Sequence, residues 1–393
     1  MTSVTALPSS PGRLPALCRR GAFPLYASVL VALLAASSAP PPLYALHQAA
    51  WHFSAMTLTV VFSTYALSLL LVLLTAGTLS DHLGRGPVLA GALLAEAVAM
   101  AVFATAQGVP GLIAARILQG LATSAAGAAL LDFPRRPGRA TAANGITLVT
   151  GMALGVLAAT ALVQYAPART VYLLLLLLFT AQAAAPLLAP ETAHPHPGAR
   201  RSLRPAVTVA PASRPALALA TPGIVAAWAL GGFYSSLGPS LARLIAPHAA
   251  RATGGLLFFT MTAAAGLAAR ALPAREPRRC RAADPGSPAD PERPPSAQPA
   301  LAVRRRRGGG RGLRRRHPGS SAPAAAPGRP GRTRRHARRH YVLSYLAMSI
   351  PAVLAGLLTH VYGLQTAVSL YAVTVVLLAL TGLTRAVRRP RTT

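Results

Sequence analysis

Residues 77 to 88 read Gly77-Thr78-Leu79-Ser80-Asp81-His82-Leu83-Gly84-Arg85-Gly86-Pro87-Val88 and join two apolar segments that are each long enough to cross a bilayer. The chain must reverse its direction here within a few residues, and Gly77 and Gly84 allow the close approach and positive φ angles that such a turn requires. Asp81 can pair with Arg85 or with a facing helix terminus, and such a pair can form in one conformation and break in another. We therefore predict a conformational-switch loop; a plain hairpin with charges at the membrane edge is the alternative.

The composition argues against a soluble enzyme. Of the 393 residues, 53% are hydrophobic and 12% are charged, and the mean hydropathy is +0.45. Soluble chains average about 25% charged residues, and a helix needs roughly 20 apolar residues to cross the hydrocarbon core. The sequence therefore predicts an all-α polytopic membrane protein with ten recognisable transmembrane helices, at 22–46, 55–76, 88–106, 112–131, 142–163, 170–189, 217–238, 254–269, 341–360 and 366–383.

The distribution of arginine sets the expected orientation. All 39 basic residues are Arg, and basic residues in short loops stay on the cytoplasmic side. With the N-terminus inside, 16 Arg fall in cytoplasmic segments and three in the opposite loops, leaving aside residues 271–340. We expect a multi-pass plasma-membrane protein with both termini in the cytoplasm. Its expected parts are an N-terminal tail (1–21), a six-helix half (22–189), a cytoplasmic linker (190–216), spans seven and eight (217–270), the segment 271–340, two last spans (341–384) and a C-terminal tail (385–393).

The loop at residues 77–88 resembles the G-x-L-x-D-x-x-G-R-x-x-V signature of the major facilitator superfamily. A second stretch, Arg116-Ile117-Leu118-Gln119-Gly120, resembles the R-x-x-Q-G element of that family. Six spans, a long linker and further spans are also the layout of transporters built from two related halves. The resemblance covers the first 270 residues and the last 50 or so. It implies two six-helix halves and secondary transport of a small solute by alternating access.

Two charged residues lie within predicted spans. A central Arg costs about 2.5–3.5 kcal/mol to insert unless it faces a polar cavity, so Arg116 is a functional candidate; an arginine that reaches the outer interface is the alternative. The resemblance implies proton coupling and contacts with substrate anions for this residue, and Gln119 and Gly120 complete its element. Glu96, the one carboxylate in mid-helix, is either a proton carrier or a hydrogen-bond partner in helix packing.

Three glycines of the fifth predicted span, Gly145, Gly151 and Gly155, favour close helix packing. Small residues four apart let helices approach closely in lipid. Drug antiporters of the family usually carry G-x-x-x-G-P at this place, but Val156 stands in the proline position. Generic packing is therefore at least as good an interpretation as an antiporter motif.

Residues 271–340 break the pattern on either side. They contain 19 Arg, 13 Ala, 12 Pro and 8 Gly among 70 residues, a composition that cannot span a bilayer and that favours disorder. In a transporter of two six-helix halves, this region would hold spans nine and ten. One hypothesis is that the DNA for those spans is read here in a shifted frame. The other is an authentic arginine-rich loop that binds anionic lipid or, without base stacking, nucleic acid.

We expect proton-coupled efflux of a small solute by alternating access, with no enzymatic activity, cofactor or metal. The expected partners are the solute, protons and the lipid bilayer, and no specific nucleic acid. Two alternatives stay open. In the family, spans one, four, seven and ten line the central cavity, so a chain without span ten is a transporter remnant that does not transport. A membrane-anchored arginine-rich module is the other alternative.

Overall fold

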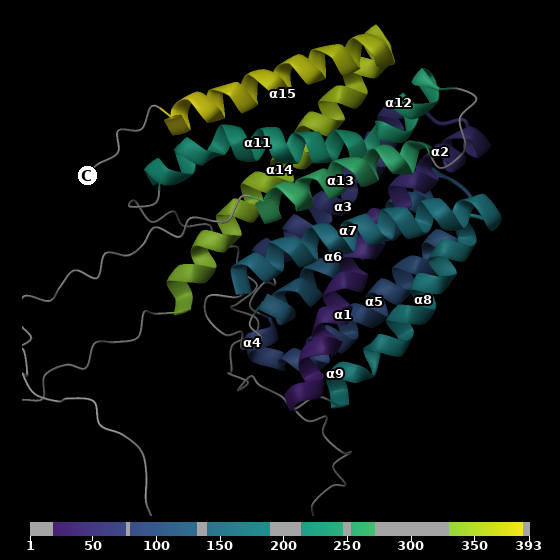
Figure 1. Cartoon of the computed structure of the whole chain (residues 1–393). Coiled ribbons are helices and arrows are strands. Elements are labelled where there is room, and N and C mark those ends of the chain that lie inside the picture. The colour runs from purple at the N-terminus through teal and green to yellow at the C-terminus, as the bar shows by residue number, and fades with distance from the viewer. Residues whose placement is uncertain are drawn as a thin grey trace, which may run out of the picture. The chain divides into compact units, whose positions relative to one another are not determined.

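The computed structural model of the chain describes residues 19–75, 79–131, 140–188, 214–246, 253–271 and 330–387. These residues form helices and no strand (Figure 1). The helices are α1 (Arg19–Ser38), α2 (Pro40–Trp51), α3 (Ala55–Thr75), α4 (Ser80–Leu83), α5 (Arg85–Thr105), α6 (Val109–Leu131), α7 (Ala140–Tyr165), α8 (Arg169–Ala183), α9 (Ala185–Leu188), α11 (Arg214–Ser236), α12 (Gly238–Ile245), α13 (Thr253–Ala271), α14 (Pro330–Tyr362) and α15 (Leu364–Val387).

The all-α polytopic membrane fold predicted from the sequence is confirmed. Within the described residues, eight helical stretches are long and apolar enough to cross a membrane. Two shorter apolar stretches, Thr150–Tyr165 in α7 and Thr253–Ala265 in α13, lie in the fifth and eighth predicted spans. Each of the ten predicted spans therefore contains helix.

The boundaries differ from the prediction in two places. The first span consists of two helices, because Pro40, Pro41 and Pro42 interrupt its hydrogen bonding. The segment 271–340 was expected to be disordered, but Ala271 ends α13 and α14 begins at Pro330, eleven residues before the predicted span. Proline is favoured in the first turn of a helix and arginine is a good helix former, so the helix extends into the charged stretch. Residues 272–329 lie outside the described part.

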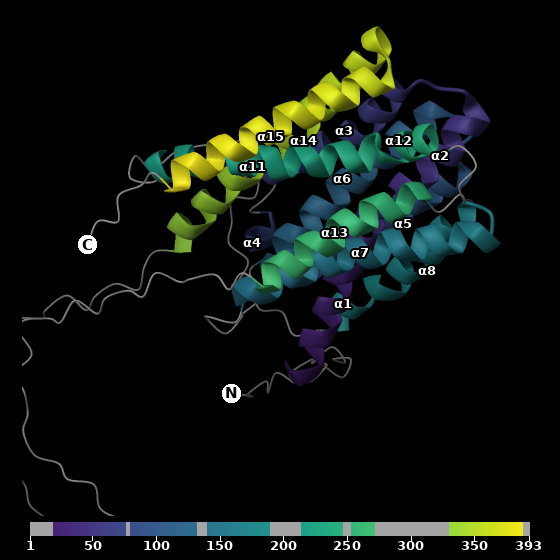
Figure 2. The same ribbon diagram turned by 45° about the horizontal axis from the view of Figure 1, so that its top comes forward.

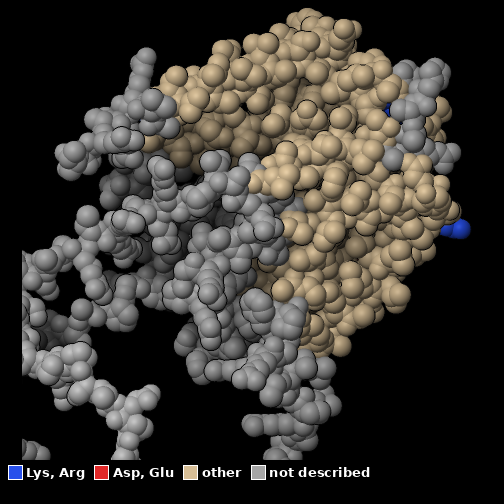
Figure 3. All heavy atoms as spheres, viewed as in Figure 1, with Lys and Arg blue, Asp and Glu red and all other residues tan. Residues whose placement is uncertain are grey.

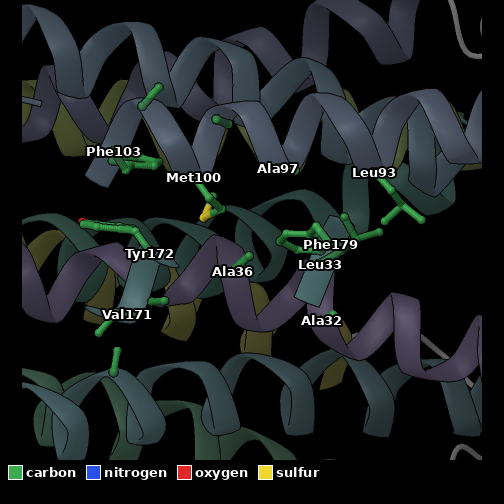
Figure 4. Close-up of a cluster of buried hydrophobic side chains, with 14 of the residues drawn as sticks. Ala32, Leu33, Ala36, Leu93, Ala97, Met100, Phe103, Val171, Tyr172 and Phe179 are labelled. Carbon is green, nitrogen blue, oxygen red and sulfur yellow. The ribbon is translucent and has the colours of Figure 1, made fainter. Parts of the chain in front are cut away.

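Apolar side chains of α1, α5 and α8 pack together in the first half of the chain (Figure 4). α5 packs closely along α8, and the small alanines of α1 and α5 leave room for the larger side chains of this cluster. Close packing of this kind holds helices together in lipid, where burial of apolar surface supplies little driving force. The labelled members of this cluster are Ala32, Leu33, Ala36, Leu93, Ala97, Met100, Phe103, Val171, Tyr172 and Phe179.

Helices of the second half pack against α7, α3 and α2 of the first. α13 lies against α7 on one side and α11 on the other (Figure 2). Across another contact, Phe62 and Tyr65 of α3 pack with Met348 of α14, and the Ser63 hydroxyl donates to the Ser349 carbonyl at 3.4 Å. The two halves therefore meet through α7 with α13, through α3 with α14 and through α2 with α12.

The outer surface of the described helices is mostly uncharged. On the face shown in Figure 3, described atoms of basic residues appear only near one end, and no described acidic atom is visible. Many large apolar side chains are exposed, such as Leu177 at 68% and Leu383 at 60%. A surface of this kind suits contact with lipid chains.

Substitution of Gly120 tests the packing of α6 on α3. A Cβ atom at Gly120 would collide with the backbone carbonyl of Tyr65 and lie 2.9 Å from Ser68 Cβ, whereas one at Gly127 of the same helix would meet nothing within 4 Å. Gly120→Ala should lower the free energy of unfolding in detergent by about 1–3 kcal/mol. Gly127→Ala should change it by less than about 1 kcal/mol. Equal effects of the two substitutions would contradict this packing.

Candidate functional site

Three prolines leave backbone carbonyls of the first span without their usual helical donors. Proline has no backbone N–H, so Pro40, Pro41 and Pro42 cannot bond the carbonyls four residues earlier. The last regular bond before them runs from the Ala39 N–H to the Ala35 carbonyl at 2.9 Å. All three prolines are buried, and a buried carbonyl without a donor is costly. Donors from elsewhere must therefore serve the carbonyls of residues 36 to 38.

Arg116 and Gln119 of α6 supply donors to two of these carbonyls. Gln119 Nε2 donates to the Ala36 carbonyl at 2.9 Å, and Arg116 Nη1 donates to the Ser37 carbonyl at 3.4 Å. Arg116 Nη1 also donates to Gln119 Oε1 at 2.7 Å. Both side chains have no exposed surface, and their spacing of three residues places them on one side of α6. Arg116 is therefore buried among the helices, and its side chain does not reach the surface of the described part.

Aromatic rings surround the guanidinium of Arg116. Its Nε donates to the Tyr44 hydroxyl, and its Cζ lies 5.3 Å from the ring centres of Tyr44 and Tyr65 and 5.7 Å from that of Phe103. Such contacts favour a cation. The Nη2 atom is buried and has no hydrogen-bond partner. Among the described side chains, no carboxylate forms an ion pair with this arginine.

Glu96 of α5 faces the same side of α6. Its side chain has no exposed surface. Oε1 accepts a hydrogen bond from the Thr123 hydroxyl at 3.2 Å, and Oε2 is buried without a partner. Thr123 follows Gln119 by one helical turn, so one face of α6 presents Arg116, Gln119 and Thr123 in a row. The site is thus a buried polar strip that holds one cation and one acid.

The predicted switch loop is described only in part. Gly84 separates α4 from α5 with φ 92°, a positive angle that favours glycine. Arg85 begins α5 and is half-buried. Gly77 lies outside the described residues, and of Asp81 only the backbone, in α4, is described. The pairing of Asp81 with Arg85 stays a prediction.

Two of the three glycines of the fifth span lie against α1. A Cβ atom at Gly151 would lie 2.8 Å from Leu34 Cβ, and one at Gly155 would collide with the Ala35 backbone. The Ser38 hydroxyl donates to the Met152 carbonyl at 2.8 Å across the same contact. Gly145 belongs to α7, but its surroundings are not described.

A contact between α2 and α12 joins the two halves at the end of the bundle opposite the 79–84 turn. Arg243 Nη1 donates to the Ala45 carbonyl at 2.7 Å, and Nη2 donates to Gln48 Oε1 at 2.7 Å. The Ser240 hydroxyl donates to the same Gln48 oxygen at 3.1 Å. The first helix of the second half is thus interrupted after Ser236, as α1 is after Ser38, and the two outer pieces bond to each other.

Sequence reasoning missed several of these residues. Nothing in the local pattern around Arg243 indicates its bonds to a segment nearly 200 positions earlier. The run Pro40-Pro41-Pro42 and the 116, 119, 123 spacing on α6 are signals that could have indicated the buried strip. No group of three His, Cys, Asp or Glu side chains that could hold a metal occurs in the described part of the chain.

If the backbone N–H at position 40 is restored, the free energy of unfolding should depend less on Gln119. Pro40→Ala returns an N–H directed at the Ala36 carbonyl, because Ala39 is already helical with φ −69° and ψ −38°. Gln119→Leu alone should cost about 1–3 kcal/mol of unfolding free energy in detergent, and about 1 kcal/mol less in the Pro40→Ala background. Pro42→Ala is the matched control, since its N–H faces another carbonyl. Equal costs of Gln119→Leu in all backgrounds would contradict the assignment.

Loss of Arg243 should loosen the contact between α2 and α12. In a variant without Cys18 and Cys280, spin labels are attached at positions 50 and 245. Double electron–electron resonance spectroscopy then measures the distance between the labels and so the separation of α2 and α12. Arg243→Gln should increase the long-distance population roughly fivefold, if the contact contributes about 1 kcal/mol. Arg169→Gln removes an exposed arginine of α8 and should leave the distances unchanged. An unchanged distribution in Arg243→Gln would show that the contact does not hold the halves together.

Comparison with known proteins identifies the family. The model of the Major Facilitator Superfamily matches residues 25–283, and no curated protein matches the sequence. The crystal structure of the human organic anion transporter MFSD10 (TETRAN) is similar, with a TM-score of 0.54 and 17% sequence identity over 93% of this chain and 99% of that chain. A likeness at this identity shows the fold alone. With well over half of its length matched by the family model, the chain belongs to the major facilitator superfamily, as the loop and the R-x-x-Q-G element predicted.

Proposed function

We propose that this secondary transporter carries a small organic anion, together with a proton, out of the cell by alternating access. Family membership gives secondary transport of a small solute through the membrane. The nature of the solute, the coupling to protons, the outward direction and the plasma membrane are the parts that we propose here.

The observation that carries the proposal is the buried charge of Arg116, which has no ion-pair partner among the described side chains. A buried charge without a counterion costs several kcal/mol, and a carboxylate or sulfonate would offset that cost through the unpartnered Nη2 atom. The three rings around the guanidinium suit the apolar part of such a solute. The printed name of MFSD10, an organic anion transporter, agrees with this class of solute.

Glu96 supports coupling to protons. When it is ionised, its negative charge balances Arg116 through the polar strip of α6; when it is protonated, Arg116 is left unbalanced and attracts an anion more strongly. Proton and anion therefore favour each other's binding. Because each ligand strengthens the binding of the other, the coupling supports transport of anion and proton in the same direction. The absence of the antiporter proline at Val156 agrees with this.

The arginine distribution supports the orientation. With the N-terminus in the cytoplasm, the 79–84 turn faces the cytoplasm and the end at which α2 meets α12 faces outward. The bonds of Arg243 then close the outer side, and alternating access requires them to break.

Transport of a permanently charged probe tests the proposal. In proteoliposomes with a pH dye inside, an external acid pulse should drive uptake of radiolabelled benzenesulfonate and acidify the lumen. Arg116→Gln should reduce uptake at least tenfold, the equivalent of about 1.4 kcal/mol, whereas Arg169→Gln should retain it. Benzyltrimethylammonium serves as the cationic control. Uptake of the cation but not of the anion, or uptake without acidification, would contradict the proposal.

The end of the family match supports a second candidate, a remnant that does not transport. The match stops at residue 283, within the arginine-rich segment that stands where spans nine and ten are expected. A folded, inserted protein that binds benzenesulfonate but shows no uptake would favour the remnant. Translation of the other two reading frames across 271–340 provides an independent test, because apolar runs of about 20 residues there would indicate a frame change.

A further inference from the structure

Four aromatic rings form a ladder between the α2–α12 end of the bundle and Arg116. Trp51 stacks on His47 at 4.7 Å between ring centres, and His47 lies 6.5 Å from Tyr172 of α8. Tyr172 in turn stacks on Phe103 of α5 at 4.9 Å. Phe103 is one of the rings around the Arg116 guanidinium. The ladder thus joins a half-buried histidine to the buried cation.

His47 has a ring nitrogen without a hydrogen-bond partner in this ladder. Its Nε2 atom is buried and has no hydrogen-bond partner, and the hydroxyl of Tyr172 is likewise buried and unpartnered. His47 follows Tyr44 by three residues and therefore lies on the same side of α2. Tyr44 accepts a hydrogen bond from Arg116. A second route, through a single helical turn, therefore links the imidazole to the guanidinium.

The charged groups near His47 are all basic. Arg116 approaches from α6 by way of Tyr44, and Arg243 of α12 bonds the neighbouring Ala45 carbonyl and Gln48. α8 presents Tyr172. α7 and the described side chains of α13, which also contact α2, carry no acidic, basic or histidine side chain. The acid Glu96 lies on α5, beside Thr123 of α6.

We propose that His47 is a second proton-binding residue of the transporter and that its charge is coupled to the site at Arg116. The inference rests on the proton-coupled anion transport proposed above. The neutral imidazole accepts one proton from hydronium at Nε2 and leaves one water molecule; no other bond changes. Because the imidazolium and the guanidinium repel each other, an anion bound at Arg116 favours the protonated histidine, and loss of the anion favours release of the proton.

Trp51 reports the charge of His47 without any solute. A protonated imidazole stacked on an indole quenches its fluorescence more than a neutral one does. The chain has two Trp residues, so Trp228→Phe leaves Trp51 as the single emitter. In this background the full-length protein should lose emission in one reversible step as the pH is lowered from about 8 to about 3, a range that extends below the ordinary histidine value because the charged groups near His47 are basic. His47→Gln should abolish the step, and His52→Gln, which removes the exposed neighbour of Trp51, should retain it.

The coupling between His47 and Arg116 is tested by changes in the pH at which the fluorescence step occurs. Arg116→Gln should displace it toward higher pH by roughly half a unit or more, because a neighbouring positive charge is removed. Arg169→Gln should leave it in place. Saturating benzenesulfonate should displace it in the same direction in the protein that retains Arg116. A protein without the step, a step that survives His47→Gln, or a step that Arg116→Gln does not move would overturn the inference.

Failure of the inference is distinguishable from failure of the proposed function. Loss of the step with intact benzenesulfonate uptake would leave anion transport standing and remove His47 from it. A normal step that moves with Arg116→Gln, but without uptake or binding of benzenesulfonate, would establish the coupled histidine and contradict the proposed solute.

Discussion

The structure depends on three adjacent prolines that leave carbonyl groups of the first span without their helical donors. A bilayer offers no water to bond these carbonyls, so the protein must supply donors from another helix. Gln119 donates to the Ala36 carbonyl and Arg116 to the Ser37 carbonyl, which brings a charged side chain of the fourth span into the centre of the first half. The R-x-x-Q spacing is thus explained physically: two donors one helical turn apart serve two consecutive acceptors.

The same arrangement gives the site its chemistry. The guanidinium, which lies among backbone carbonyls and aromatic rings, has one nitrogen without a hydrogen-bond partner. Glu96 of α5 faces this polar side of α6, where its carboxylate accepts a hydrogen bond from Thr123, and in the proposed mechanism it is the acid whose proton changes the balance of charge. In the proposed mechanism, solute and proton act on one another through electrostatics, and neither needs to contact the other.

The interruption of the first helix in each half would connect this site to the proposed motion of the halves. α2 and α12 are the outer pieces of the first and seventh spans, and they bond to each other through Gln48, Ser240 and Arg243. The prolines that free the carbonyls also define where α2 begins. A ligand that changes the hydrogen bonding of Ser37 or Tyr44 therefore acts on the helix that carries the contact with the other half.

The sequence was sufficient for the membrane fold, the positions of the spans and the family, because apolar length and the two motifs are local signals. It also indicated Arg116 and Glu96 as candidates, since a charged side chain within an apolar helix is costly to insert into a bilayer. It did not indicate Tyr44 or Arg243, whose partners lie 72 and up to 198 positions away in the chain. Such pairs follow from how the helices pack. The helical start of α14 at Pro330 was missed because composition alone was used for that segment.

The central claim is that the carbonyls freed by Pro40 and Pro41 hold the Arg116 and Gln119 side chains inside the first half. An experimental structure of the full chain in a lipid nanodisc, at a resolution that shows side-chain rotamers, tests it most directly. The account predicts density for Gln119 Nε2 at hydrogen-bond distance from the Ala36 carbonyl, with the guanidinium between Tyr44, Tyr65 and Phe103. A guanidinium directed to the membrane surface, with these carbonyls bonded by other groups, would contradict it.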